Sequence, residues 1–313
     1  MNLKNLTFVS EFILLGFSSN TSTQIALFLV FLSFYIITCL GNFLIIVVTL
    51  TNTRLHKPMY FFLTNLSVLD IIYSTTNVPK ALRDLVSLRK TISLAACAAQ
   101  MYISLALGIT ECFLFAVMAY DRYVAICYPL HYVTVMTNTL CFCASVSTWA
   151  CGFIFSFIQI TTTLNVPTCG HNIINHFFCE GPGYLSLSCT DNFINNVVTF
   201  ILCVIILMIP VCCIVISYIR IMRTIMKMNT SESRRKAFST CASHMMAVTL
   251  YFGSCSAMYM KPQSYYLPKR DKIIAIFYII VTPMLNPLIY TLRNREVTLA
   301  LKNFGQWCLE LLA

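Results

Sequence analysis

The sequence predicts an all-α integral membrane protein, a seven-transmembrane helix bundle with a short amphipathic helix after the seventh helix. The first observation is composition, because 58% of the 313 residues are hydrophobic and only 10% are charged. That is more apolar surface than a water-soluble core can bury. The second is pattern: the apolar residues form long unbroken runs, which favour helices over the ten-residue alternating strands of a membrane barrel.

Seven apolar runs are long enough to cross a bilayer, which takes about 20 helical residues. They cover approximately 25–50, 59–80, 97–124, 140–161, 197–221, 237–260 and 273–292. We therefore predict an extracellular N-terminus over 1–24, the bundle over 25–292, and a cytoplasmic amphipathic helix and tail over 293–313, where basic and apolar residues alternate.

The distribution of basic residues predicts the orientation. The segment over 220–236, at the end of the fifth run and after it, carries six Lys and Arg residues, whereas the loop over 165–196 carries none. Because basic loops stay on the cytoplasmic side, the N-terminus is expected outside the plasma membrane and the C-terminus inside. Asn5 begins an Asn-Leu-Thr glycosylation signal on the outer side. The formal charge of +10 is scattered between apolar runs, which predicts contact with membrane lipids and no nucleic-acid partner.

A charged pair, Asp121 and Arg122, stands at the end of the third apolar run. Charge is costly at that depth unless it is paired or used, so the pair marks a functional site. The alternative is a chance ion pair at the membrane interface, where long side chains can reach water.

Asp121 and Arg122 belong to one of five sequence motifs that follow each other along the chain. These motifs are Leu-His-Lys-Pro-Met-Tyr-Phe-Phe-Leu over 55–63, Met-Ala-Tyr-Asp-Arg-Tyr-Val-Ala-Ile-Cys over 118–127, Ser-Tyr over 217–218, Lys-Ala-Phe-Ser-Thr-Cys-Ala-Ser-His over 236–244 and Pro-Met-Leu-Asn-Pro-Leu-Ile-Tyr over 283–290. With these motifs the whole chain resembles the odorant (olfactory) receptors of the tetrapod type (class II), which are rhodopsin-like (class A) G-protein-coupled receptors. Lys57 departs from the neutral residue common in the family and is expected to change little.

The resemblance implies a receptor that binds a small volatile odorant in the outer half of the bundle. It also implies activation of a heterotrimeric G protein of the olfactory stimulatory type, a rise in cyclic AMP, and a place in the cilia of olfactory sensory neurons. A rhodopsin-like receptor for a non-odorant metabolite outside the nose would share every motif. A channel or transporter would need a continuous polar path or repeats, which the sequence lacks. No nucleophile elbow, zinc-binding helix or phosphate loop is present, so no enzyme is expected.

The resemblance assigns the inner half of the bundle to G-protein coupling. The implied residues are Asp121, Arg122, Tyr123, Tyr218, His244, Asn286, Pro287 and Tyr290. On activation, Arg122 is expected to leave Asp121 and to reach toward Tyr218 and the G protein.

The odorant cavity is inferred from helical spacing and from the resemblance. Counting back in turns from Asp121 gives one face of the third helix. The residues on that face are Met101, Ser104, Leu105, Gly108 and Ile109, to which the resemblance adds Leu202, Ile206, Phe252, Cys255, Ser256, Tyr259, Ile276 and Ile279. Such a lining, with no Lys, Arg, Asp or Glu, suits a small uncharged molecule oriented by one or two hydrogen bonds. For the apolar members, packing of helix against helix is an equal alternative.

Residues 251–253 read Tyr-Phe-Gly where the family has Phe-Tyr-Gly. The exchange removes a hydroxyl from the lower wall of the cavity.

Two carboxylates, Asp70 and Glu111, interrupt apolar runs and must face inward. With Asn42, Ser67 and Asn286 placed nearby by the resemblance, they predict a sodium ion that acts as an allosteric modulator, because two close carboxylates need a cation or a shared proton. A hydrogen-bond network around one protonated acid is the alternative. No other cofactor and no transition metal is predicted.

Four cysteines, Cys97, Cys169, Cys179 and Cys189, lie near one predicted membrane face and indicate disulfides in an oxidising compartment. The resemblance pairs Cys97 with Cys179 and Cys169 with Cys189. A metal site is the competing interpretation, since His171, His176 and Glu180 lie among the same thiols. If the thiols are bridged, only His171 and His176 remain to assist binding of sulfur ligands through a metal.

Overall fold

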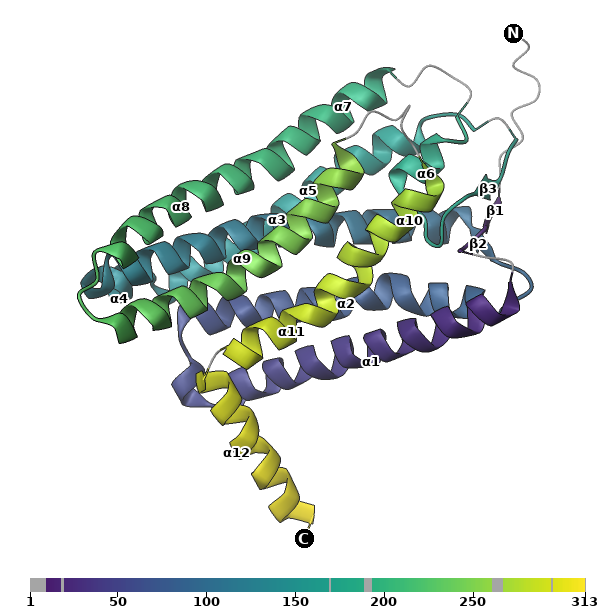
Figure 1. The fold of residues 1–313 in the computed structure, drawn as a ribbon. Coiled ribbons are helices and arrows are strands. Elements are labelled where there is room, and N and C mark those ends of the chain that lie inside the picture. Colours follow the sequence, from purple (N-terminus) through teal and green to yellow (C-terminus); the bar gives the residue numbers. More distant parts are fainter. Residues whose placement is uncertain are drawn as a thin grey trace.

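The computed structural model describes residues 10–17, 20–168, 170–188, 193–260, 267–293 and 295–312. Long helices lie side by side along most of the molecule (Figure 1). They are α1 (Thr21–Thr51), α2 (Pro58–Val86), α3 (Leu94–Cys127), α5 (Asn138–Leu164), α7 (Phe193–Cys203) continued by α8 (Ile209–Met226), α9 (Ser231–Tyr259), and α10 (Pro268–Ile276) continued by α11 (Thr282–Arg293). Short helices are η2 (Thr53–Leu55), η3 (Pro129–His131), α4 (Tyr132–Val135) and α6 (Gly181–Leu185).

Within the described residues, five of these helical segments are long and apolar enough to cross a membrane. They are Thr21–Thr51, Leu94–Cys127, Asn138–Leu164, Phe193–Met226 and Pro268–Tyr290. Helices α2 and α9 have similar lengths, but α2 contains Asp70, Lys80, Arg83 and Asp84, and α9 begins with a charged turn. The charged side chains of these two helices lie in the bundle interior or at the helix ends, and they lower the mean hydropathy of α2 and α9.

The helices extend beyond the apolar runs from which they were predicted. Helix α2, for example, ends at Val86 rather than near residue 80, and α9 begins at Ser231 rather than near residue 237. Polar residues account for the extra turns: Asn20, Ser93 and Thr137 cap α1, α3 and α5 through side-chain bonds to backbone amides. Hydropathy detects only the apolar part of such a helix.

A small sheet covers one end of the bundle, which we call the sheet end. Its strands β1 (Glu11–Leu14), β2 (Thr91–Ser93) and β3 (Ile173–Ile174) lie in the order β2-β1-β3, with β1 antiparallel to β2 and parallel to β3. Phe12 and Leu14 of β1 are fully buried and pack with Ile92 and Tyr184. Strands of two to four residues leave no alternating pattern long enough to predict, so the sequence analysis missed this sheet.

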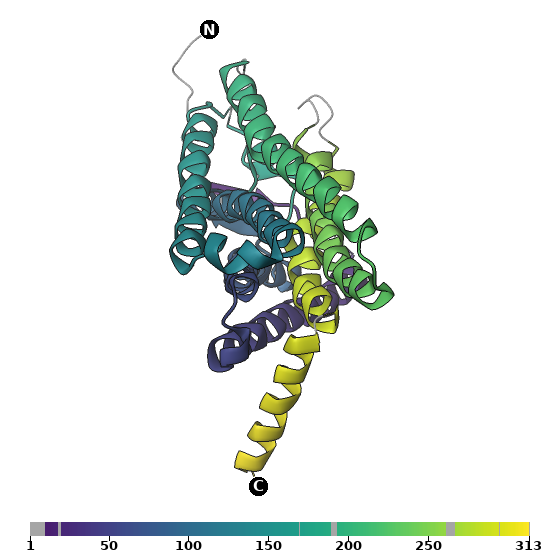
Figure 2. The same ribbon diagram turned by 90° about the vertical axis from the view of Figure 1, so that its left-hand side faces the viewer.

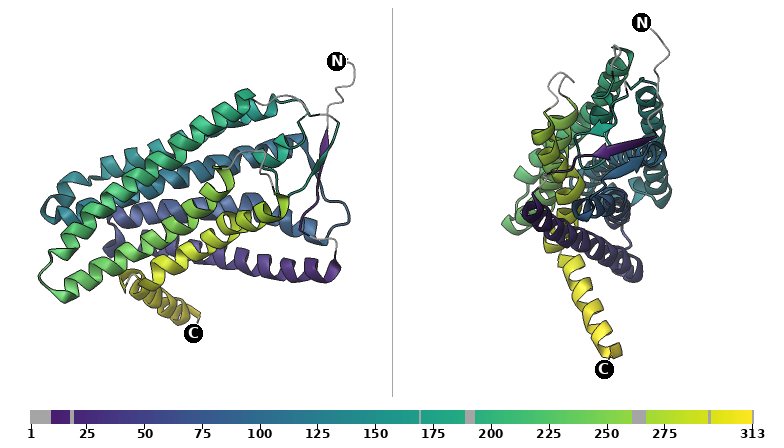
Figure 3. Two further views of the ribbon diagram at one scale, coloured as in Figure 1. Left: turned by 45° about the horizontal axis from the view of Figure 1, so that its top comes forward. Right: turned by 90° about the vertical axis from the view of Figure 1, so that its right-hand side faces the viewer.

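Helix α3 is central, because it contacts α2, α5, α8 and α9. Figure 2 looks along the bundle from the end opposite the sheet, which carries Arg122 and which we call the Arg122 end. Helix α12 (Arg295–Leu312) leaves the bundle at this end and projects away from it (Figure 3).

Lys57 contacts α12 through an ion pair with Glu296 of 2.8 Å, so this departure from the family has a specific partner. The pair is exposed and contributes about 0–1 kcal/mol.

Helices α3 and α5 approach closely at Gly152. A Cβ atom there would lie 2.1 Å from Thr110 Oγ1 and 2.5 Å from the carbonyl oxygen of Ala106. We expect Gly152→Ala to destabilise the protein by about 1–3 kcal/mol, since the two backbones must separate. The measurement is the Tm of purified protein. Gly253→Ala is the matched control, because a Cβ at Gly253 meets no atom within 4 Å; equal Tm values for the two variants would contradict the prediction.

Candidate ligand and coupling sites

The residues predicted to line the odorant cavity come from α3, α7, the π-helical turns η4 (Val204–Met208) and η6 (Phe277–Val281), α9 and α10. Met101, Ser104, Ile109, Leu202, Ile206, Phe252, Cys255 and Ile279 are buried, and Leu105, Gly108, Ser256, Tyr259 and Ile276 are partly buried. Met101 packs in the cluster around the disulfide at the sheet end, whereas Ile109, Phe252 and Cys255 belong to the main core. The set therefore spans two packed clusters.

The two π-helical turns were not predicted. Ile206 lies within η4, and Ile279 lies within η6, so each widened turn presents a predicted cavity residue. A π-helical turn inserts one residue into the helix and shifts the side chains that follow, and such turns occur often at functional sites. Apolar periodicity alone cannot locate them, because both segments are uniformly apolar.

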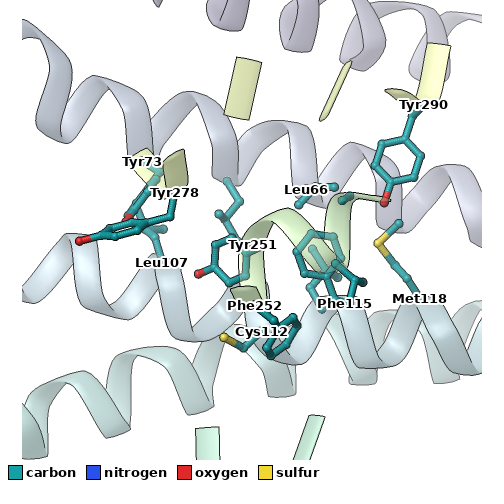
Figure 4. Packing of buried hydrophobic residues seen from close by; sticks show 14 of the residues in the cluster. Leu66, Tyr73, Leu107, Cys112, Phe115, Met118, Tyr251, Phe252, Tyr278 and Tyr290 are labelled. Atoms are coloured by element: carbon teal, nitrogen blue, oxygen red, sulfur yellow. The ribbon is translucent and has the colours of Figure 1, made fainter. Parts of the chain in front are cut away.

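Two hydrogen bonds tie α3 to neighbouring helices within this region. Ser104 Oγ donates to Asn77 Oδ1 on α2 at 3.0 Å, and the Tyr251 hydroxyl donates to the Gly108 carbonyl oxygen at 2.7 Å. The hydroxyl that the family carries at the position of Phe252 is thus displaced by one residue, where it joins α9 to α3. Figure 4 shows Tyr251 lying between the pair Tyr73 and Tyr278 and the rings of Phe115 and Phe252.

A buried carboxylate borders the predicted cavity. Glu180, in the segment before α6, is 3% exposed and interacts electrostatically with the hydroxyls of Tyr259 and Tyr278. His176 Nε2 lies 3.4 Å from Glu180 Oε1. Glu180 is not one of the thirteen predicted lining residues, so that predicted lining still contains no Asp or Glu. Glu180 was missed because an irregular loop has no helical period from which its position can be inferred.

The predicted acid pair lies in the middle of the bundle. Asn286 Nδ2 donates to both oxygens of Asp70, at 3.0 and 3.2 Å, and Asn42 Nδ2 donates to the Pro283 carbonyl oxygen. Among the described residues, both oxygens of Glu111 and the side-chain oxygens of Asn42 and Asn286 are buried without a hydrogen-bond partner. Ser67 is buried on the same helix as Asp70. These unpartnered oxygens are the donor type that hard cations prefer.

Ser74 adds a further unpartnered buried hydroxyl, one helical turn from Asp70. The sequence analysis did not include it, although its spacing of four residues from Asp70 was a usable signal.

At the Arg122 end, the charged pair is separated. Asp121 Oδ1 accepts a hydrogen bond from the Tyr132 hydroxyl of α4 at 2.7 Å, and Arg122 Nη1 donates to the Thr240 carbonyl oxygen of α9 at 2.6 Å. No ion pair joins Asp121 to Arg122 within this described part of the chain. The expectation that Arg122 rests against Asp121 is therefore wrong: each side chain fastens α3 to a different element.

Other predicted coupling residues gather around Arg122. The Tyr218 hydroxyl lies 2.9 Å from His244 Nδ1, and the two rings stack with centroids 5.7 Å apart. Arg122 and Tyr290 also line a cavity of about 20 Å³, which is room for about one water molecule. Figure 4 shows the Tyr290 hydroxyl near Met118, another residue of that cavity. Polar side chains of α3, α8, α9 and α11 thus lie close together at this end of the bundle.

The remaining members of the coupling set lie at the edges of this cluster. Tyr123 donates a hydrogen bond to Tyr128 at 3.4 Å. Pro287 packs against α1, where a Cβ at Gly41 would lie 3.0 Å from its Cγ.

Tyr132, missed by the sequence analysis, holds Asp121 in place. Burial and the Asp121 charge raise the pKa of the Tyr132 hydroxyl, so it remains a donor at neutral pH. We expect Tyr132→Phe to raise ligand-independent signalling about tenfold or more, because a lost hydrogen bond to a charged group, worth about 1.5–3 kcal/mol, frees this end of α3. The measurement is the cyclic AMP level without ligand, compared at matched surface expression. Tyr120→Phe, on an exposed ring, is the control; unchanged basal output from Tyr132→Phe would refute the role.

The disulfide between Cys97 and Cys179 is present, with a Cα–Cα distance of 5.4 Å, as the resemblance implies. Cys169, Cys189 and Asn5 lie outside the described residues. His176 is fully buried between Phe177 and Phe178, while His171 is exposed. In the described ranges no three His, Cys, Asp or Glu side chains are grouped to hold a metal ion.

Known proteins similar to this chain include olfactory receptors of human and mouse. The family model described as olfactory receptor matches residues 31–304. The chain is 48% identical over 302 residues to human olfactory receptor 2B2, covering 96% of this chain and 85% of that protein. It is 49% identical over 305 residues to human olfactory receptor 6B1, covering 97% of both. Mouse olfactory receptor 2B6 is 46% identical over 302 residues, covering 96% of both.

Proposed function

Because the chain belongs to the olfactory receptor family, we propose that it detects a small volatile odorant and passes the signal to a heterotrimeric G protein. The chain is a multi-pass membrane receptor and not an enzyme, as its relatives are receptors. In the proposal the chain crosses the membrane seven times: the five most apolar helical segments span it, and α2 and α9 are the other two spans. The sheet end faces outside, the Arg122 end faces the cytoplasm, and α12 lies on the inner surface.

The proposed odorant site lies between α3, η4, α9 and η6 toward the sheet end. Its support is the mostly apolar set of partly buried residues there, with hydroxyls from Ser256 and Tyr259 available for orientation. Because the predicted lining carries no charged side chain, we propose an uncharged ligand that these hydroxyls orient.

The observation that carries the coupling proposal is the bond from Arg122 to the Thr240 carbonyl oxygen. It fastens α3 to α9 at the Arg122 end. A ligand that binds better when α9 has moved outward shifts the population toward a state in which this bond is broken and Arg122 is released. Ligand affinity and G-protein affinity are then coupled reciprocally. We propose the olfactory stimulatory G protein as partner, a rise in cyclic AMP as output, and neuronal cilia as location.

Expression of the full chain with a cyclic AMP reporter, followed by screening of volatiles and metabolites, tests this function. A dose-dependent cyclic AMP rise with a volatile supports it. A response to non-volatile metabolites alone would replace the odorant by a metabolite ligand. Ion flux without ligand, and no cyclic AMP response to any compound, would refute the receptor mechanism in favour of a channel or transporter.

We also propose that Asp70, Glu111, Asn42, Ser67 and Asn286 hold a sodium ion. The unpartnered buried oxygens of Glu111, Asn42 and Asn286 fit such an ion, which when bound would supply positive charge between two carboxylates. A bound ion stabilises the conformation that holds these residues together. The competing arrangement, in which one acid is protonated, would need no cation.

Sodium-dependent thermal stability distinguishes these two arrangements. At ten times its Kd, sodium is expected to stabilise the purified receptor by roughly 1.4 kcal/mol, seen as a higher Tm in sodium chloride than in equimolar choline chloride. Glu111→Gln should remove the difference, and Glu232→Gln, an exposed acid on α9, should retain it. Equal Tm values in both salts for the unmodified chain would favour the protonated network.

A further inference from the structure

A second cavity lies on the outside of the bundle and has a lining separate from the predicted odorant residues. It is a groove of about 650 Å³ between α3, α5 and α8. Phe113 and Val117 of α3 form its floor with the buried Phe62 of α2, and Ala144 of α5 and Ile216 of α8 form its two walls. None of the thirteen residues predicted for the odorant cavity lines it. Its volume is within the range of small-molecule sites, about 300–1,000 Å³.

The helix arrangement explains why the groove exists. Both α5 and α8 pack on α3, and α5 contacts α7 toward the sheet end. Nearer the Arg122 end, the lining of the groove includes the small side chains Ala144 of α5 and Cys213 of α8. Figure 2 shows α5 and α8 on either side of α3 as seen from this end. Small side chains on diverging helices leave a long apolar channel open to the surface.

The polar residues of the groove are concentrated at one end. Arg220 of α8 is exposed at the rim, and the phenols of Tyr120 and Tyr123 come from the last turns of α3. The walls toward the sheet end carry mostly apolar side chains and no charge. A long apolar channel that ends in one cation and hydroxyl donors matches an anionic amphiphile, whose chain fills the channel and whose headgroup reaches Arg220.

We infer that the groove binds an anionic glycerophospholipid of the cytoplasmic leaflet, with one acyl chain between α5 and α8 and the phosphate at Arg220. The inference rests on the membrane orientation given under the proposed function. Charge complementarity selects this occupant, because the leaflet at the Arg122 end is the one rich in anionic lipid. Tyr123 belongs both to the groove and to the predicted coupling set, so a bound lipid contacts the segment that meets the G protein.

Photocrosslinking in lipid nanodiscs tests the site. The full chain is reconstituted with phosphatidylserine or phosphatidylcholine that carries a diazirine in one acyl chain, and labelled peptides are mapped by mass spectrometry. Phosphatidylserine is expected to label the groove peptides of α5 and α8 about fivefold more than phosphatidylcholine does, the ratio that one surface arginine supplies. Labelling spread evenly over all membrane-facing helices would overturn the site.

Matched variants separate the two parts of the inference. Ala144→Phe fills the groove and should remove the preferential labelling, whereas Ala150→Phe, on an exposed position of α5 outside the groove, should not. Arg220→Gln should bring phosphatidylserine labelling down to that of phosphatidylcholine, and Arg223→Gln should leave it unchanged. Equal labelling by the two lipids in the unmodified chain would overturn the anionic headgroup.

The same preparations report on the proposed function separately. A chain that fails to insert into nanodiscs would contradict the membrane orientation itself. A chain that inserts and responds to an odorant, but shows no preferential labelling, would overturn only the lipid site.

Discussion

Arg122→Ala is expected to reduce odorant-dependent cyclic AMP output about ten- to a hundredfold while the protein still reaches the cell surface. In the structure the Arg122 guanidinium holds α9 through the Thr240 carbonyl oxygen and lines the small cavity with Tyr290. Once α9 moves outward, the same side chain is the cation available to the G protein at this end of α3. A charged hydrogen-bonding contact of this kind is worth about 1.5–3 kcal/mol, and loss of the contact to the G protein is the change that lowers the output.

The measurement is the cyclic AMP dose response at surface expression matched by flow cytometry. Arg54→Ala is the control, because Arg54 is an exposed arginine of η2 whose side chain is not among the residues around Arg122. A normal maximal response from Arg122→Ala would refute the assigned role. A loss of surface expression in that variant alone would instead assign Arg122 to folding.

The separation of Asp121 from Arg122 shows what sequence adjacency cannot predict. Successive residues on a helix point about 100° apart, so neighbours in sequence do not face each other. Asp121 therefore meets Tyr132 and Arg122 meets α9. The sequence places both charges near the end of the third helix, because charge at the end of an apolar run is conspicuous. The partners come from other elements and required the tertiary arrangement.

The long helices were predictable for a different reason. An apolar run of about 20 residues has few alternatives in a membrane, so composition alone indicates most of the bundle. The π-helical turns η4 and η6, the three short strands and the exact helix ends depend on local packing and capping, which hydropathy does not report.

Within the candidate site, the residues that could be predicted are those that recur at helical spacing along α3. Met101, Ser104 and Ile109 were predicted to face inward by counting helical turns, and all three are buried. Asn77, which binds Ser104, and Glu180, which borders Tyr259, were missed. Asn77 lies on a different helix, and Glu180 lies in a loop, so neither position follows from the period of α3.

Cys179→Ser is expected to prevent most of the protein from reaching the cell surface. The disulfide joins residues 82 positions apart, and both cysteines are fully buried at the sheet end. Cys179 also donates its backbone amide to Gln100 Oε1, while Gln100 Nε2 donates to the Thr76 carbonyl oxygen of α2. Loss of a native disulfide typically costs about 2–5 kcal/mol. Here it also releases the loop that carries His176, Glu180 and β3 over the predicted ligand region.

Surface labelling and total protein, measured together, test this expectation, since a destabilisation of about 1–2 kcal/mol already changes cellular abundance several-fold. Cys97→Ser should reproduce the loss, and the double variant should be no worse than either single one, because the bridge is a single interaction. Cys212→Ser, an exposed cysteine of α8, should behave like the unmodified chain. Normal surface levels of Cys179→Ser would show that Gln100 and the sheet suffice to hold the loop, and the disulfide would then have no role in folding.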